Sequence, residues 1–343
     1  MYLKPQRIFL ILSVLLPVSF IAAISLGAVY LPVNDVFSSL LGLHFHSAAS
    51  STMSDLIVNQ IRLPRALLAA AVGALLGISG AASQGLFRNP LADPSLIGVT
   101  AGAMAGGSIA IVLGGSALAG YWGLSLISIG AFIGGVITVF IVYRLATSSM
   151  GTSVATMLLA GIAITALASS LNSFLEFIAN DEMLRRISLW KMGGLEGADT
   201  IRTTIALLVA LVIIIVMPRQ ATALNALLLG ESEARHLGID VDKVKRQLIL
   251  LIAAAVGVAV ALAGTISFVG LIVPHIVRLI IGPDHRYLLV ASAFAGSVLL
   301  LLADTFSRII IAPTEIPAGM VTALIGAPFF IFLLRQKTMP SIR

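Results

Sequence analysis

Long uninterrupted apolar segments are the feature that most restricts how this chain can fold. Several of them reach the roughly 20 residues that an α-helix needs to cross a bilayer. Only 10% of the residues are charged, whereas 59% are hydrophobic and the mean hydropathy is +1.07. That is too little charge to cover the surface of a soluble protein. The segments also lack the alternation typical of β-barrels, so the sequence predicts an all-α polytopic membrane protein.

We expect about ten transmembrane helices, because that many segments have the required length and apolar character. Their approximate ranges are 8–31, 64–86, 94–114, 123–145, 152–178, 201–218, 245–264, 268–282, 287–310 and 316–335. The range 268–282 is short and contains Pro274, which predicts a broken helix or a helix preceded by a loop. The first range is longer than the core of a signal peptide, and we interpret it as a retained anchor. All spans are assigned to one transmembrane domain, residues 1–343.

The distribution of basic residues predicts how the chain is oriented. With the N-terminus inside, about two-thirds of the 21 Lys and Arg residues lie on the cytoplasmic side, as expected for a membrane protein. Both termini are therefore expected in the cytoplasm. The same bias accounts for the net charge of +6, so no nucleic-acid partner is predicted.

The longest polar interruption covers residues 220–247 and lies between two apolar runs. A polar hairpin of this size cannot lie in hydrocarbon, where unpaired polar groups are costly. The predicted orientation puts it in the cytoplasm. We therefore expect it to present a folded surface to a partner.

The sequence offers no catalytic constellation. It has no cysteine, which excludes disulfides, thiolate metal sites and cysteine nucleophiles. The motifs HExxH, GxxxxGK[ST] and GxSxG are also missing. We therefore predict a chain that is not an enzyme and that holds no metal or cofactor. A membrane-embedded enzyme would need clustered His, Asp or Glu at one depth.

Charged residues at membrane depth are few. Glu176 and Asp304 fall near the outer ends of their spans, where salt bridges are favoured over a proton relay. Arg62, Arg65 and Arg308 also fall near the outer side. They could attract an acidic partner surface or extend to lipid headgroups, and the residues alone favour neither reading. Dense glycines in 98–107 and 130–135 are interpreted mainly as close helix packing.

Several segments resemble a known family of bacterial permeases. They are 62–65 (RLPR), 84–94 (QGLFRNPLADP), 229–238 (LGESEARHLG), 268–275 (FVGLIVPH) and 326–330 (GAPFF). Together they resemble the FecCD/BtuC-type permeases of ABC importers for iron chelates, haem and cobalamin. The likeness runs from about residue 55 to the C-terminus and is specific as a set, although each motif alone is modest.

This resemblance implies a BtuC-like type II importer fold in the bacterial inner membrane. The expected partners are a second copy of the chain, two cytoplasmic ATPases, a periplasmic binding protein and membrane lipid. ATP and Mg²⁺ would be used by the ATPases, and this chain would bind no cofactor. In the family, the hairpin after span six contacts the ATPase and outer arginines dock the binding protein, the latter matching Arg62, Arg65 and Arg308. The implied coupling residues are Asn225, Leu229, Gly230, Glu231, Ala234, Arg235, His236, Leu237 and Gly238.

Two details depart from the family pattern or leave alternatives open. A Thr-Ser pair narrows the cytoplasmic gate of the family's cobalamin importer, but Val154 and Ala155 stand at those positions here. The neighbouring Thr152, Ser153 and Thr156 are the alternative gate residues. The motif wording favours haem as substrate, ahead of ferric siderophore and then cobalamin. Met104, Met157 or Met320 could ligate haem iron, although methionines in spans more often only pack. An ion-coupled secondary transporter is the alternative from another class.

Overall fold

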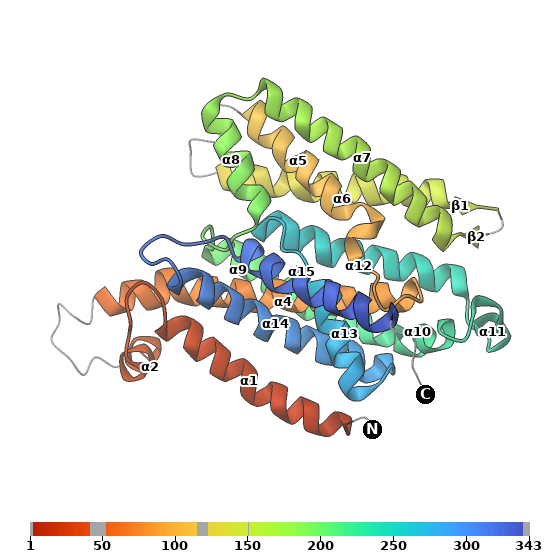
Figure 1. Cartoon of the computed structure of the whole chain (residues 1–343), viewed down its shortest axis with the longest axis horizontal. Helices are drawn as coiled ribbons and strands as arrows, with labels where there is room; N and C mark the ends of the chain where they lie inside the picture. Colours follow the sequence, from red (N-terminus) through yellow and green to blue (C-terminus); the bar gives the residue numbers. More distant parts are fainter. Residues whose placement is uncertain (1–2, 42–52, 115–122, 150, 339–343) are drawn as a thin grey trace.

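The computed structural model describes residues 3–41, 53–114, 123–149 and 151–338. Almost every described element is a helix (Figure 1). The helices are α1 (Pro5–Ser25), α2 (Val33–Leu41), α4 (Leu63–Leu86), α5 (Val99–Gly114), α6 (Gly123–Ala146), α7 (Val154–Ile178), α8 (Asp181–Met192), α9 (Thr200–Val216), α10 (Ala221–Leu227), α11 (Glu231–His236), α12 (Val241–Ala263), α13 (Val269–Ile281), α14 (His285–Ile309) and α15 (Ala318–Thr338). A small hairpin joins β1 (Thr147–Ser148) to β2 (Gly151–Thr152), and tighter or wider helical turns occupy Ile57–Arg62, Pro94–Ile97 and Met217–Gln220.

The predicted all-α, multi-span class is confirmed. Within the described residues, 7 helices are long and apolar enough to cross a membrane, and shorter apolar helices cover Val99–Gly114, Val269–Ile281 and Ala318–Phe332. The short α13 contains Pro274 and follows a loop whose last residue, Phe268, has a φ of 66°. The expected short helix with a preceding loop is therefore present.

Two boundaries and one additional helix differ from the sequence-based expectations. The first predicted span, 8–31, is too long, because α1 ends at Ser25 and the chain then turns into α2. The span expected at 201–218 continues as helix to Leu227, because the tight turn Met217–Gln220 joins α9 to α10 without a loop. The helix α8 was not expected, because its many charged residues do not resemble a transmembrane span. It is amphipathic, and Asn180 caps its N-terminus.

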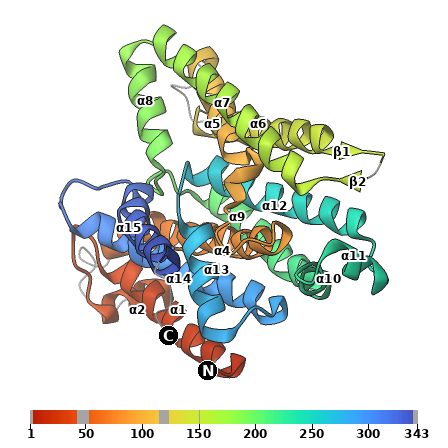
Figure 2. The same cartoon turned by 45° about the vertical axis from the view of Figure 1, so that its right-hand side comes forward.

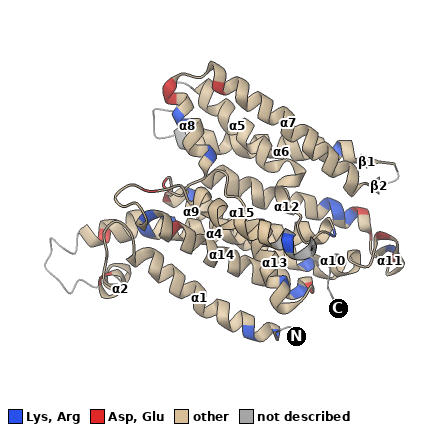
Figure 3. Cartoon of the chain, viewed as in Figure 1, with Lys and Arg blue, Asp and Glu red and all other residues tan. Residues whose placement is uncertain are grey.

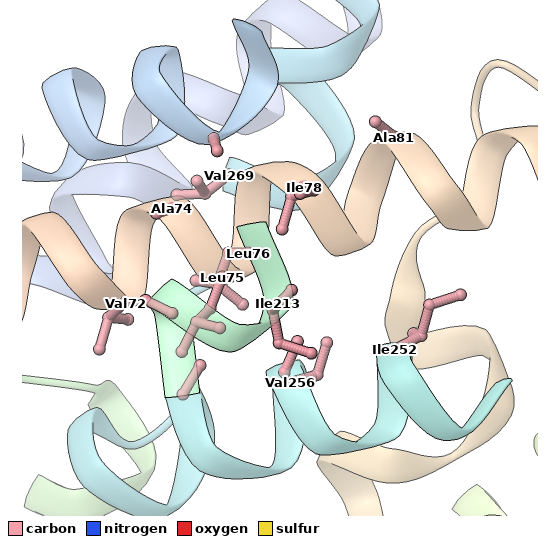
Figure 4. Packing of buried hydrophobic residues seen from close by; sticks show 14 of the residues in the cluster. Val72, Ala74, Leu75, Leu76, Ile78, Ala81, Ile213, Ile252, Val256 and Val269 are labelled. Atoms are coloured by element: carbon pink, nitrogen blue, oxygen red, sulfur yellow. The ribbon is translucent and has the colours of Figure 1, made fainter. Parts of the chain in front are cut away.

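The helix α4 is the centre of the packing. In the most apolar 18-residue stretch of the helical segment Met53–Leu86, which includes α4, 89% of the residues are buried. The helix α4 contacts α14, α13, α9 and α12. Figure 4 shows Leu75 of α4 meeting Ile213 of α9 and Val256 of α12. Figures 1 and 2 show α5, α6, α7 and α8 as one group of helices, which α12 joins to the rest of the bundle.

Glycines allow the closest helix contacts. A Cβ added to Gly73 of α4 would overlap the backbone of Gly296 in α14, and Gly106 of α5 faces Gly130 of α6 in the same way. Small residues permit this approach of two backbones, which strengthens packing in lipid. The interpretation of these glycines as packing residues is supported.

Charged residues gather at the two ends of the bundle and are sparse between them (Figure 3). One end carries α10, α11, the beginning of α1 and the end of α15, and the other carries α2 and α8 (Figure 1). Near the first of these ends, the Leu3 amide donates to the Ile280 carbonyl over 2.8 Å. We call the end with α10 and α11 the hairpin end, and the end with α2 and α8 the opposite end.

Candidate functional site: the hairpin end and its connections

The polar hairpin folds into two short helices, α10 and α11. Gly230 and Gly238 bracket α11 with φ values of 129° and 81°, a backbone region that favours glycine. The chain can therefore reverse sharply on both sides of α11. The predicted glycine positions in this hairpin have a local structural role.

Asn225 fastens α10 to the start of α14. Its side-chain Nδ2 donates to Oδ1 of Asp284 over 2.7 Å, and its Oδ1 accepts from the backbone N–H of His285 over 2.9 Å. Burial alone would raise the pKa of Asp284, but hydrogen bonds from the Arg286 amide and from Asn225 lower it below its usual value. The carboxylate is thereby kept charged as a fixed acceptor. Asn225 acts here as an internal anchor.

The hairpin exposes three leucines among charged and polar side chains. Leu228, Leu229 and Leu237 are 41%, 67% and 65% exposed. Leu237 follows directly on the exposed Arg235 and His236, while Ala234 is buried against the core. Exposed leucines at a bundle end rich in charge are a typical feature of a contact surface. The predicted coupling residues thus divide into an exposed group and an anchoring group.

The predicted gate residues surround the start of α7. Thr152 is buried at the end of β2, and Ser153 caps α7 by accepting a hydrogen bond from the Thr156 amide over 3.3 Å. Val154 is half-buried, while Ala155 and Thr156 are exposed. The Ser153 cap fixes where α7 begins, and the gate role of this segment stays a prediction.

The three predicted docking arginines converge, but they are buried. Arg62, Arg65 and Arg308 are only 6%, 6% and 5% exposed. Arg62 donates to the Ile24 and Ser25 carbonyls over 2.6 and 2.9 Å. These bonds satisfy carbonyls that the end of α1 leaves without helical partners. The expected open ring of cations is therefore corrected to an internal cluster, whereas the docking role itself stays a prediction.

Carboxylates hold the rest of this cluster. Asp304 forms salt bridges with Arg65 and Arg308, with nitrogen–oxygen distances of 2.9 and 3.2 Å. Glu315 forms a third with Arg65 over 2.6 Å. Glu176 pairs with Lys191 over 2.7 Å. Both acids noted in the sequence therefore form salt bridges, as expected.

A cavity of about 460 Å³ lies between α4, α5, α12 and α13. Small polar side chains and one methionine share its lining with apolar residues. The polar members and the methionine are Asp93, Ser95, Thr100, Met104, Thr265 and Ser267. The sequence did not single out these polar residues, because they come from three separate segments, 93–95, 100–104 and 265–267. Asp93, Ser95, Thr265 and Ser267 lie near Pro94 or Phe268, which is the signal that could have found them, whereas Thr100 lies within α5.

The comparisons with known proteins agree with this architecture. The family model of the FecCD transport family matches residues 15–336. The cobalamin import system permease protein BtuC of Halobacterium salinarum is 45% identical over 84% of this chain and 76% of its own length. The hemin transport system permease protein HmuU of Yersinia pestis is 42% identical over 91% of this chain and 94% of its own length.

A solved structure has the same fold. It is an inward-facing conformation of an ABC transporter assigned to the metal-chelate type, with a TM-score of 0.84 and 31% identity. The match covers 97% of this chain and 100% of that one. The chain therefore belongs to the FecCD transport family and has the fold of its ABC importer permeases.

Proposed function

We propose that this chain is the permease subunit of an ATP-driven importer that moves haem across the bacterial inner membrane. The observation that carries the proposal is the hairpin, which presents Leu229 and Leu237 outward while Asn225 anchors it to the core. A rigid, short helix with exposed apolar side chains suits a groove on a partner. In the proposal, two ATPases bind there and use ATP and Mg²⁺, and two copies of this chain form the pathway.

The cavity supports a pathway that contacts a large ligand with few specific groups. Its lining combines apolar residues with a few small polar side chains and the carboxylate of Asp93, and the described residues hold no group of three or more metal-binding side chains. Met104 lies in this lining, whereas Met157 is buried and Met320 is 39% exposed. Among the three methionines considered, Met104 is therefore the one positioned to meet a ligand in the cavity.

Haem is the preferred substrate because the hemin permease of Yersinia pestis matches nearly the full length of both chains. Cobalamin is the second candidate, since the Halobacterium salinarum relative is slightly more identical over a shorter part. The wider family leaves a ferric siderophore as a third. An ion-coupled secondary transporter is disfavoured, because Asp304 and Glu176 are both engaged in ion pairs.

We expect a periplasmic binding protein to dock at the opposite end, near Arg62, Arg65 and Arg308. These side chains already bond to the chain itself, so pairing with partner carboxylates would require them to leave those bonds. Their present contacts also hold the ends of α1, α4 and α14 together. A fixed surface for docking would follow from that role.

Uptake into liposomes tests the proposed function. The permease is reconstituted with its ATPase and binding protein, and haem, a ferric siderophore and cobalamin are offered separately. We expect haem uptake that needs both ATP and the binding protein. Uptake of another ligand would replace haem and keep the class, whereas uptake without the ATPase would overturn the class.

A further inference from the structure

The side chain of Lys245 is buried at the hairpin end, although it lies in the polar first turns of α12. It is 2% exposed, while Lys243 and Arg246 on the same turns are exposed. Its ammonium lies 2.7 Å from Oε2 of Glu231 in α11 and donates to the Thr152 carbonyl over 2.7 Å. A buried ammonium is costly unless it is paired, so these two oxygens define its position.

Asp242 makes a second connection between the same elements. Its Oδ1 accepts the Thr152 amide over 3.1 Å, and its Oδ2 lies 3.2 Å from Arg235 of α11. Residues 242 and 245 are three apart and so share one face of α12. Both the N–H and the C=O of Thr152 are therefore held by side chains of α12, and each of these side chains is also held by a charge on α11.

The geometry of β2 is adapted to this contact. Gly151 has a φ of 107°, and a Cβ placed there would come within 2.6 Å of Oδ1 of Asp242. The Thr152 hydroxyl lies 3.0 Å from that of Thr147, which closes the β1–β2 hairpin. The backbone can therefore approach the carboxylate closely while the hairpin stays intact.

Thr152 leads directly into α7. Ser153 caps this helix. In its most apolar 18-residue stretch only 22% of the residues are buried within the chain, against 72% in that of α12. Most residues of α7 are exposed within the described part of the chain. The two ion pairs and the Thr152 peptide form a continuous connection between α11 and the start of α7.

We propose that Lys245 and Asp242 are positioning residues that link the coupling helix α11 to the gate segment at the start of α7. The proposal rests on the proposed function, in which α11 meets the ATPase. The two side chains make α11, the first turns of α12 and β2 move as one unit. Neither residue is among those that line the cavity.

A distance measurement tests the link without any substrate. Because the chain has no native cysteine, spin labels can be placed at Ser149→Cys, between β1 and β2, and at Ser232→Cys on α11. Labelled chains are diluted into unlabelled chains in nanodiscs, so that only distances within one chain contribute. We expect a narrow distribution for the parent and for the control Lys243→Met. Lys245→Met and Asp242→Ala should broaden it and shift it to longer distance.

Transport per ATP tests the consequence in the complete importer. We expect Lys245→Met and Asp242→Ala to retain ATP hydrolysis while the ATP used per imported substrate rises roughly fivefold or more. Lys245→Arg, which keeps a charged donor, should restore part of the coupling, and Lys243→Met should match the parent. If Lys245→Met does not reach the membrane, Asp242→Ala carries the test, because its side chain is 44% exposed.

Failure of the proposed link and failure of the proposed function give different results. Unchanged distances together with unchanged ATP use per substrate in both variants would overturn the link. A parent complex that imports nothing with ATP would contradict the proposed function. The distance measurement would still decide whether α11 and the β1–β2 hairpin are joined.

Discussion

Arg65 and Asp304 form an ion pair that joins α4 to α14, with Nη2 of Arg65 2.9 Å from Oδ1 of Asp304. Their side chains are 7% and 1% exposed, and 239 residues separate them in sequence. Asp304 also receives Arg308. One buried carboxylate therefore compensates two buried cations at the end of the bundle opposite the hairpin.

We predict that Asp304→Asn lowers the free energy of unfolding by about 3 kcal/mol or more, because buried Arg308 loses its paired carboxylate and Arg65 keeps only Glu315. Unfolding in mixed micelles measures the change. The control is Glu182→Gln, which removes the exposed Arg186–Glu182 pair and should cost below about 1 kcal/mol. Equal effects of the two substitutions would contradict a structural role for the cluster.

Gly73→Ala should destabilise the contact between α4 and α14 by about 1–3 kcal/mol, because the added methyl overlaps the backbone of Gly296. Gly257→Ala is the matched control, since its nearest neighbour would be the Phe132 ring at an ordinary 3.5 Å. Thermal unfolding in detergent compares the two. A Gly73→Ala protein as stable as Gly257→Ala would show that the helices can separate without cost.

Replacing the exposed leucines tests the coupling surface. Leu229→Ser with Leu237→Ser should leave membrane insertion intact and reduce copurification of the ATPase, because the two side chains are more than half exposed and available to a partner. Leu145→Ser, a control for an exposed leucine at the end of α6, should have no effect on the ATPase. Retention of the ATPase by the double variant would move the contact elsewhere.

Deleting 230–237 should abolish ATP-coupled transport while the helices still insert, because the deletion removes α11 and leaves the apolar spans unchanged. Immunodetection in membranes and uptake in liposomes measure the two properties. Transport that survives the deletion would refute the coupling assignment of this hairpin.

Arg62→Glu, Arg65→Glu and Arg308→Glu together should weaken docking of the binding protein and reduce uptake. The burial of these arginines means that stability falls as well, so each variant is checked for folding before binding is measured. Arg185→Glu on the exposed surface of α8 is the control for a change of charge at the same end. Unchanged uptake in the folded triple variant would count against the docking role.

The sequence by itself determined the class, the number of apolar segments and the family. A bilayer requires long apolar helices, and a polar hairpin must leave it, so both features can be read from composition and spacing. The short helix around Pro274 was predictable for the same local reason. Motifs in 84–94 and 229–238 carried the resemblance without knowledge of any contact.

Only the tertiary structure decided which charges are exposed and which are paired. Arg62 and Lys245 look like surface residues in the sequence, because each stands near a predicted membrane boundary. In the fold, Arg62 reaches the carbonyls at the end of α1, and Lys245 reaches Glu231 and the Thr152 carbonyl. Residues 152 and 245 are 93 positions apart, and a contact of that range depends on how α12 packs beside the β1–β2 hairpin. Local sequence patterns describe one helix at a time, so they cannot specify a partner that another helix brings into place.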